Sequence, residues 1–289
     1  MENEIRRQLP GTLQRLVDEV ETAGGVEIEV RRDPNQQTTA EARTLYGDHG
    51  QAGATPDSLS LILSFKGDIA ATDKIYRQPF AVVAHELLHL RRWVVQQVPG
   101  IHSITGLPTS SAPVQGDAVA RLFTTTGLDE LVEHSVIDPS LPDYGLDFPN
   151  RGSIPEIWDA FPNQPWEKWG MMRWIVLQEF LRVHFLVRNS QLQRYAEDVM
   201  RRFGMLDEGR WLVEQFRWLL ASPDQVAAKF GACFCLCVVF HIPPTEFMFL
   251  ERRPGYLGIR NFPPVISVPK PGGGQFTFHL EPPKSGCSR

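Results

Sequence analysis

The stretch "AVVAHELLHL", residues 81–90, is the most specific part of the sequence, because polar side chains interrupt an otherwise apolar run. His85 and His89 are four residues apart, and Glu86 directly follows the first histidine. On a helix, residues four apart lie on one face, with about 5–6 Å between their Cβ atoms. Two imidazoles at that spacing can bind one ion through Zn–N bonds of about 2.0–2.1 Å. The stretch therefore predicts a helix over about residues 75–98 that carries two metal ligands.

Glu86 points roughly 100° further around the helix than His85, because one turn takes 3.6 residues. Its carboxylate is therefore poorly placed to be a third ligand to the same ion. It can instead lean over the open side of the ion and take a proton from a bound water, whose pKa the metal lowers to about 7. We expect Glu86 to be the catalytic general base.

The pentapeptide "HELLH" resembles the HExxH signature of the zincin metallopeptidases. The resemblance covers the motif, its helix and the strand before it, and it implies a Zn²⁺ ion and hydrolysis of peptide bonds. It also implies an edge strand that aligns the substrate, and "SLSLILSF", residues 58–65, lies where that strand would fall. The side chains around the motif are uncharged, as the family prefers, whereas Arg91 departs from the usual apolar choice.

A third ligand is expected from "GLDELVEHSVID", residues 127–138, on a helix predicted from about Asp117 to Ile137 and ended before Pro139. A glutamate from a second helix is the third ligand in the glutamate-type zincins, which this arrangement resembles. The resemblance favours Glu133, because a histidine follows it and it lies deeper in the helix. Glu130 is an open alternative, and so is His134, which would make a three-histidine site.

Stabilisation of the transition state requires a donor aimed at the developing oxyanion. We name His134 as the candidate for this catalytic role, by residue type alone. His102, Tyr144 and His184 carry equally suitable side chains.

The remaining patterns predict an α+β fold that is predominantly helical. The resemblance implies that residues 1–150 are a zincin-like part, with a small sheet beside the motif helix and the third-ligand helix. Alternation in "VEIEVRR", residues 26–32, predicts one strand of that sheet. Residues 151–289 are expected to be mostly helical, with a Pro- and Gly-rich tail, and to form the other wall of the cleft. Cys233, Cys235 and Cys237 are expected to be small core residues.

Composition narrows the choice of partners. The 289 residues carry a formal charge of −5, so no general attraction to nucleic acid or to an anionic membrane is expected. The N-terminus has no apolar core of signal-peptide length, and the longest apolar run is far short of the roughly 20 residues of a membrane-spanning helix. Four cysteines are too few for a disulfide framework. We therefore expect a cytoplasmic protein.

Two functions of different classes fit these patterns. The first is a zinc metallopeptidase that cleaves a restricted intracellular protein or peptide substrate. The alternative is a non-catalytic protein, either a metal-stabilised scaffold or a protein-interaction module, in which the motif helix is structural. The sequence assigns no oligomeric state.

Overall fold

The chain forms two compact units, each assembled from separate stretches of sequence. Unit 1 comprises Met1–Pro99, Val136–Ser153 and Glu251–Gly258, and unit 2 comprises Gly100–Ser135, Ile154–Leu250 and Ile259–Arg289. The sequence had predicted one division near residue 150. The computed structural model describes residues 2–35, 40–46, 59–70, 80–103, 129, 132–146, 176–177, 180–181, 183–185, 190–240, 244, 247–253 and 256–279.

The described residues are mainly helical with small sheets, in agreement with the predicted α+β class. Within these ranges, no helix combines the length and the apolar character that crossing a bilayer requires. The helices and strands of unit 1 that position the site are α1 (Glu2–Arg7), α2 (Gly11–Gly24), β1 (Glu27–Arg32), β2 (Ala40–Tyr46), β3 (Leu59–Phe65), α3 (Ala81–Leu90), the π-helix η1 (Arg91–Val95) and the 3₁₀ helix η2 (Leu141–Tyr144).

The unit 1 sheet has the strand order β1-β3-β2, with β1 parallel and β2 antiparallel to β3. The expectation that residues 58–65 form an edge strand is therefore wrong, because β3 is paired on both sides. Its near-continuous apolar sequence is typical of a strand whose two faces are both covered, and the consecutive residues Ile62 and Leu63 are buried. Among the described strands of this sheet, β1 and β2 each have one backbone edge outside the ladder.

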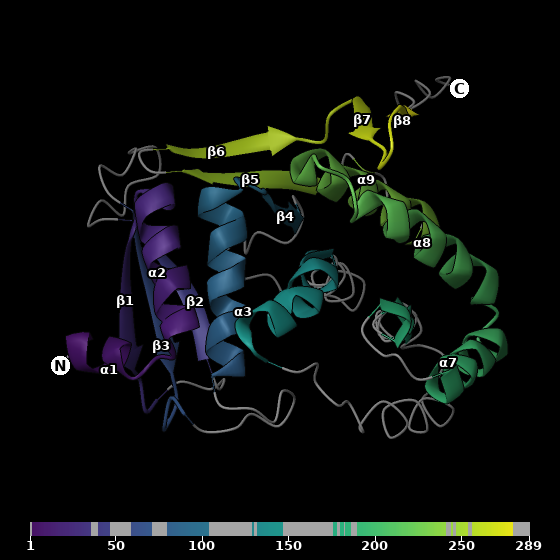
Figure 1. Ribbon diagram of the computed structural model, residues 1–289. Coiled ribbons are helices and arrows are strands. Elements are labelled where there is room, and N and C mark those ends of the chain that lie inside the picture. The colour runs from purple at the N-terminus through teal and green to yellow at the C-terminus, as the bar shows by residue number, and fades with distance from the viewer. Residues whose placement is uncertain are drawn as a thin grey trace, which may run out of the picture. The chain divides into compact units, whose positions relative to one another are not determined.

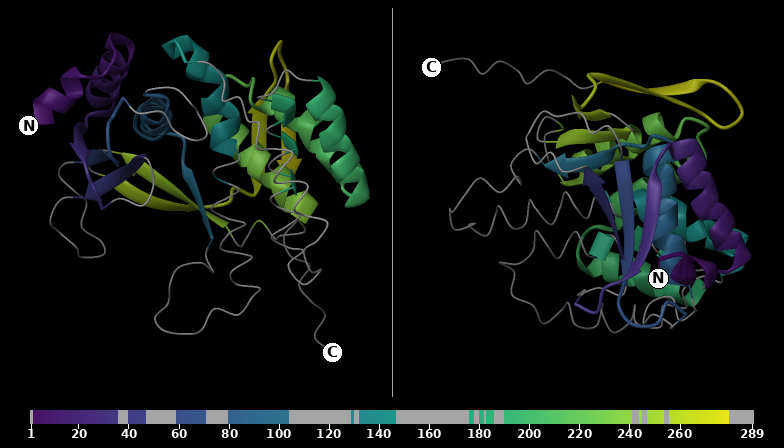
Figure 2. Two further views of the ribbon diagram at one scale, coloured as in Figure 1. Left: turned by 90° about the horizontal axis from the view of Figure 1, so that it is seen from below. Right: turned by 90° about the vertical axis from the view of Figure 1, so that its left-hand side faces the viewer.

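Helices α2 and α3 lie side by side against one face of this sheet (Figure 1), and Figure 2 shows both on the same side of the strands. Apolar residues at helical spacing in α2 and in α3 share one core with the strands. Gly25 ends α2 in the left-handed conformation, with φ 61°, which glycine adopts without steric cost. The buried side chains of α2 in this core are Leu13, Leu16, Val17 and Val20.

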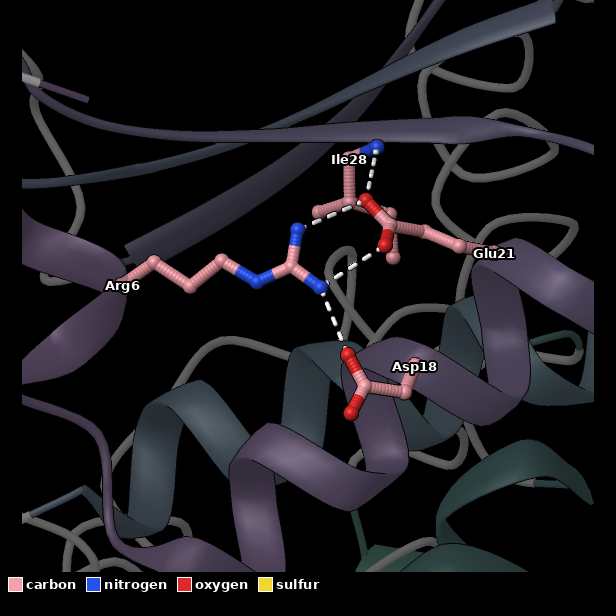
Figure 3. Close-up of polar contacts among 4 residues, drawn as sticks. All are labelled: Arg6, Asp18, Glu21 and Ile28. Atoms are coloured by element: carbon pink, nitrogen blue, oxygen red, sulfur yellow. Dashed lines mark hydrogen bonds and ion pairs between the residues drawn. The ribbon is translucent and has the colours of Figure 1, made fainter. Parts of the chain in front are cut away.

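A charged network fixes α1 to α2 and to the start of β1 (Figure 3). The Arg6 guanidinium donates to both carboxylate oxygens of Glu21, at 3.0 and 2.7 Å, and to Asp18 at 2.7 Å. Glu21 also accepts the backbone N–H of Ile28 at 3.1 Å. The hydrogen bond to Glu21 raises the pKa of Arg6, so that this guanidinium stays charged.

The motif helix is confirmed over residues 81–95, where α3 continues directly into η1; residues 75–79 lie outside the described part of the chain. Arg91, which departs from the family preference, donates to Glu19 of α2 at 2.8 Å. This ion pair joins the motif helix to its neighbour at a half-exposed position. The unusual residue is thus explained by a local partner.

The second helix of the site covers residues 132–140 and therefore continues through Pro139. The prediction that this helix ends before Pro139 is wrong. Burial of Ile137 before the proline and of Leu141 after it outweighs the tendency of proline to end a helix. Leu141, just beyond, is fully buried in the unit 1 core together with Ile137. The Ser140 hydroxyl donates to the Ile137 carbonyl oxygen at 2.7 Å.

Unit 2 is built on an apolar core between helices, with Phe180, Phe216 and Phe249 among its buried side chains. Cys233, Cys235 and Cys237 are buried in this core as free thiols, which confirms their expected role. The further elements are β4 (Gly100–Ser103), α7 (Ser190–Arg202), α8 (Leu206–Leu219), α9 (Gln225–Phe240), β5 (Phe247–Arg253), β6 (Tyr256–Asn261), β7 (Val265–Pro269) and β8 (Gln275–His279).

Candidate metal centre

The two motif histidines face each other on α3. Their Nε2 atoms are 3.1 Å apart, and their ring centroids are 4.8 Å apart with an interplanar angle of 79°. Two nitrogens that bind one tetrahedral zinc ion through bonds of about 2.0–2.1 Å are roughly 3.3 Å apart. The observed separation is close to that value, so both Nε2 atoms can reach a common ion.

Asp138 orients the first of these histidines. Its Oδ1 lies 3.2 Å from Nδ1 of His85, and its side chain is 0% exposed. A carboxylate at Nδ1 holds the proton on that nitrogen and leaves Nε2, the atom that faces His89, as the lone-pair donor. Carboxylate–histidine pairs of this kind raise the basicity of a metal-binding imidazole and fix its orientation.

His134 completes a group of three histidines, whose ligand nitrogens all lie within 4.8 Å of one another. His134 is four residues before Asp138 on the helix over residues 132–140, so the two side chains share one face. The contact of Asp138 with His85 thus places His134 beside the motif histidines. Three imidazoles in this arrangement can hold a metal ion.

Burial differs among the residues of the site. His85 is 6% exposed, whereas Glu86, His89 and His134 are each half-buried. The site therefore has a buried side, formed by His85 and Asp138. Its other side, formed by His89 and His134, is nearer to solvent.

Glu133, the residue favoured from the sequence as the third ligand, is outside the histidine group. Its carboxylate is 1% exposed and lies 2.5 Å from Nζ of Lys229, on α9. The same ammonium lies 2.5 Å from Oδ1 of Asp129. Glu130, the other carboxylate considered, lies outside the described residues.

The other three candidate donors are placed as follows. Tyr144 packs against the unit 1 core, and burial raises the pKa of its hydroxyl. His184 lies against Phe180, with ring centroids 4.4 Å apart, and burial lowers the pKa of its imidazole. The backbone of His102 pairs with Met248 in the β4–β5 ladder, and its side chain lies outside the described part.

Two residues that bear on the site were missed from the sequence, namely Asp138 and Lys229. Each carries a signal that could have found it. Asp138 follows His134 by one helical turn, the spacing at which a carboxylate can reach a neighbouring ligand. Lys229 is the only charge in the apolar sequence of α9, "QVAAKFGACFCLCVVF", and a charge in such a helix is usually paired.

Comparisons with known proteins add no family to these observations. No family model, no curated protein and no solved structure matches the chain. What is established is a group of three histidines that can hold a metal ion, on the helix that carries the HExxH sequence and on the helix over residues 132–140.

Proposed function

We propose that this protein is a zinc-dependent metallopeptidase that hydrolyses peptide bonds in a restricted protein target. The observation that carries the proposal is the convergence of His134 on His85 and His89, with Glu86 next to the first ligand on the same helix. The expected role of zinc ligand thus passes from Glu133 to His134. The roles proposed below for Glu86 and Asp138 follow from the chemistry of their carboxylates.

Zinc is the metal that this donor set suits. Three neutral imidazole nitrogens, with one position left for water or substrate, make a typical catalytic zinc site. When bound there, zinc lowers the pKa of a coordinated water to about 7 and polarises a carbonyl oxygen. Asp138 supports this assignment, because ligand histidines are usually held by a carboxylate or a carbonyl oxygen.

Glu86 carries the proton in the proposed reaction. Its carboxylate accepts a proton from the attacking water as the water oxygen forms a bond to the scissile carbonyl carbon. Glu86 then delivers that proton to the amide nitrogen as the C–N bond breaks, so that a carboxylic acid and an amine form, and the acid passes its remaining proton to the amine. His85 and Asp138 keep their positions throughout, because neither gains nor loses a proton in these steps.

The edge of the sheet that suits the substrate is β2, and not β3 as first expected. An extended peptide can add to the edge of a sheet through backbone hydrogen bonds. β2 ends the described ladder on the side where α3 packs. We therefore propose that the substrate backbone aligns along β2, over residues Ala40–Tyr46.

Glu86→Gln tests the proposed reaction, because the amide keeps the shape of the side chain but cannot accept the proton. We expect zinc to stay bound at one ion per chain while hydrolysis falls at least 100-fold. The measurement counts new peptide N-termini by mass spectrometry after incubation with the peptides of a digested cell extract. Glu27→Gln, on an exposed position of β1, is the matched control and should cleave like the wild type.

Two outcomes would contradict the proposal. New N-termini that appear equally with the wild type and with Glu86→Gln would show that Glu86 is not the base. Bound zinc with no new N-termini, from peptides or from whole unfolded proteins, would favour the alternative of a metal-stabilised scaffold.

A further inference from the structure

Lys229 is the most deeply buried charge among the described residues that the proposed reaction does not use. Its side chain is 0% exposed, and its ammonium bridges Asp129 and Glu133, at 2.5 Å from each. Asp129 also accepts the backbone N–H of Ile101 at 3.0 Å. A buried ammonium needs such partners, because removing a charge from water without compensation is costly.

The polar residues around His134 lie on two different faces of its helix. Asp129 and Glu133 are four apart and both meet Lys229, whereas His134 and Asp138 are four apart and take part in the histidine site. From Glu133 to His134 the direction turns by about 100° around the helix. Holding Glu133 at the ammonium therefore helps to set which of the two neighbours is presented to the metal.

We propose that Lys229 is a positioning residue, which holds the Glu133 carboxylate and so makes His134 the third metal ligand. The proposal rests on the metal site of the proposed function and adds a residue to it. A carboxylate next to a ligand would otherwise compete for the metal, because an anionic oxygen is itself a zinc ligand. Because the Glu133 carboxylate is paired with the Lys229 ammonium, it does not compete with His134 for the metal.

The test uses Co²⁺ in place of zinc in the full-length protein, because the visible spectrum of Co²⁺ reports the number and the kind of its ligands. Lys229→Met removes the charge and keeps much of the volume. We expect Co²⁺ to bind with a changed affinity and an altered spectrum, because the Glu133 carboxylate, without its cation, can replace His134 as a ligand. Lys270→Met, at an exposed position of unit 2, is the matched control and should leave both quantities unchanged.

Two further variants separate this role from a purely structural one. The first is a triple variant without any of the three charges, Asp129→Asn/Glu133→Gln/Lys229→Met. We expect it to restore the wild-type spectrum, because no carboxylate at position 133 remains to compete for the metal. Glu133→Gln alone should keep the wild-type spectrum and affinity, because Glu133 is not a ligand. These two variants still decide the question if Lys229→Met does not fold.

Three results would overturn the proposal. Lys229→Met with the wild-type spectrum and affinity would leave Lys229 a structural role only. Loss of Co²⁺ from Glu133→Gln, as complete as from His134→Ala, would make Glu133 a ligand. A folded triple variant with an altered spectrum would show that neutralising Glu133 is not what matters. Failure of the wild type to bind Co²⁺ would instead remove the metal site, and with it the proposed function.

Discussion

His85 contacts an aspartate that no motif search would have paired with it. Asp138 lies on a different helix, far along the sequence from the "HELLH" stretch, yet its Oδ1 is 3.2 Å from Nδ1 of the His85 imidazole. A carboxylate at this distance from Nδ1 does two things for a histidine that binds a metal. It selects the tautomer, and it fixes the orientation of the ring.

Asp138→Asn tests this contact. The amide oxygen that the substitution introduces can still accept a hydrogen bond from Nδ1–H of His85, but the negative charge is lost, so we expect His85 to be a weaker ligand. We expect the dissociation constant for zinc to rise 10- to 100-fold, measured by competition with a chromophoric chelator. Asp143→Asn, at an exposed position of η2, changes the same charge nearby and should leave zinc binding unaltered. Equal effects of the two variants would exclude a specific role for Asp138.

The sequence predicted that His85 and His89 lie together, as they do, whereas it offered His134, the third histidine of the group, only as an alternative to Glu133. His85 and His89 meet because helical periodicity alone brings them together. Glu133 and His134, by contrast, are adjacent and both chemically suited, so local pattern does not distinguish them. In the structure Glu133 lies beside Lys229, 96 positions further along the chain, whereas His134 belongs to the histidine group. Contacts at such separation leave no periodic signal.

At the scale of elements, α2 carries two glycines with opposite surroundings. A Cβ on Gly24 would lie 2.5 Å from Cγ2 of Val94, in η1, whereas a Cβ on Gly11 would meet only Arg15, at 4.0 Å. Gly24 therefore permits the close approach of α2 to the helix that continues α3. Gly11 has no such task.

We expect Gly24→Ala to lower the free energy of unfolding by about 1–3 kcal/mol, the usual cost of overpacking a core. Gly11→Ala should be neutral or should raise it by up to about 1 kcal/mol, because alanine favours a helix over glycine. Urea titration followed by circular dichroism gives both values. A Gly24→Ala variant as stable as Gly11→Ala would show that the approach of α2 to η1 is not tight.

β1 and β3 were predicted as strands, but their order in the sheet was not. The apolar run of β3 gave its secondary structure correctly, and the zincin resemblance then suggested an edge. Its pairing with both β1 and β2 shows the opposite. Alternation and apolar content report whether the faces of a strand are covered, and they carry little information on whether its backbone edges are paired. Strand order therefore had to come from the structure.

At the scale of the whole molecule, stability should depend on alkaline pH through the buried thiols of α9. Burial raises the pKa of Cys235 from an ordinary value of 9.0 to about 12, with Cys237 adding to the effect. Above pH 9 the unfolded chain releases this proton and the folded chain keeps it. The folded state then binds more protons, so its stability is full below pH 9 and falls as pH rises toward 12.

The loss attributable to Cys235 is on the order of 4 kcal/mol over that range, from about 1.36 kcal/mol for each pKa unit. Cys235→Ala should therefore flatten the fall, although Cys233, whose pKa burial also raises, keeps part of it. Unfolding free energies from urea titrations between pH 8 and pH 10.5 measure the slopes. Identical slopes for the wild type and Cys235→Ala would contradict the assignment.

The central claim is that three imidazoles, from α3 and the helix over residues 132–140, hold one zinc ion. X-ray absorption at the zinc edge of the reconstituted protein tests it most directly. We predict one zinc per chain with imidazole nitrogens at about 2.0–2.1 Å, three in the wild type and two in His134→Ala. A wild-type spectrum with sulfur at about 2.3 Å, or an imidazole count that His134→Ala leaves unchanged, would contradict the claim.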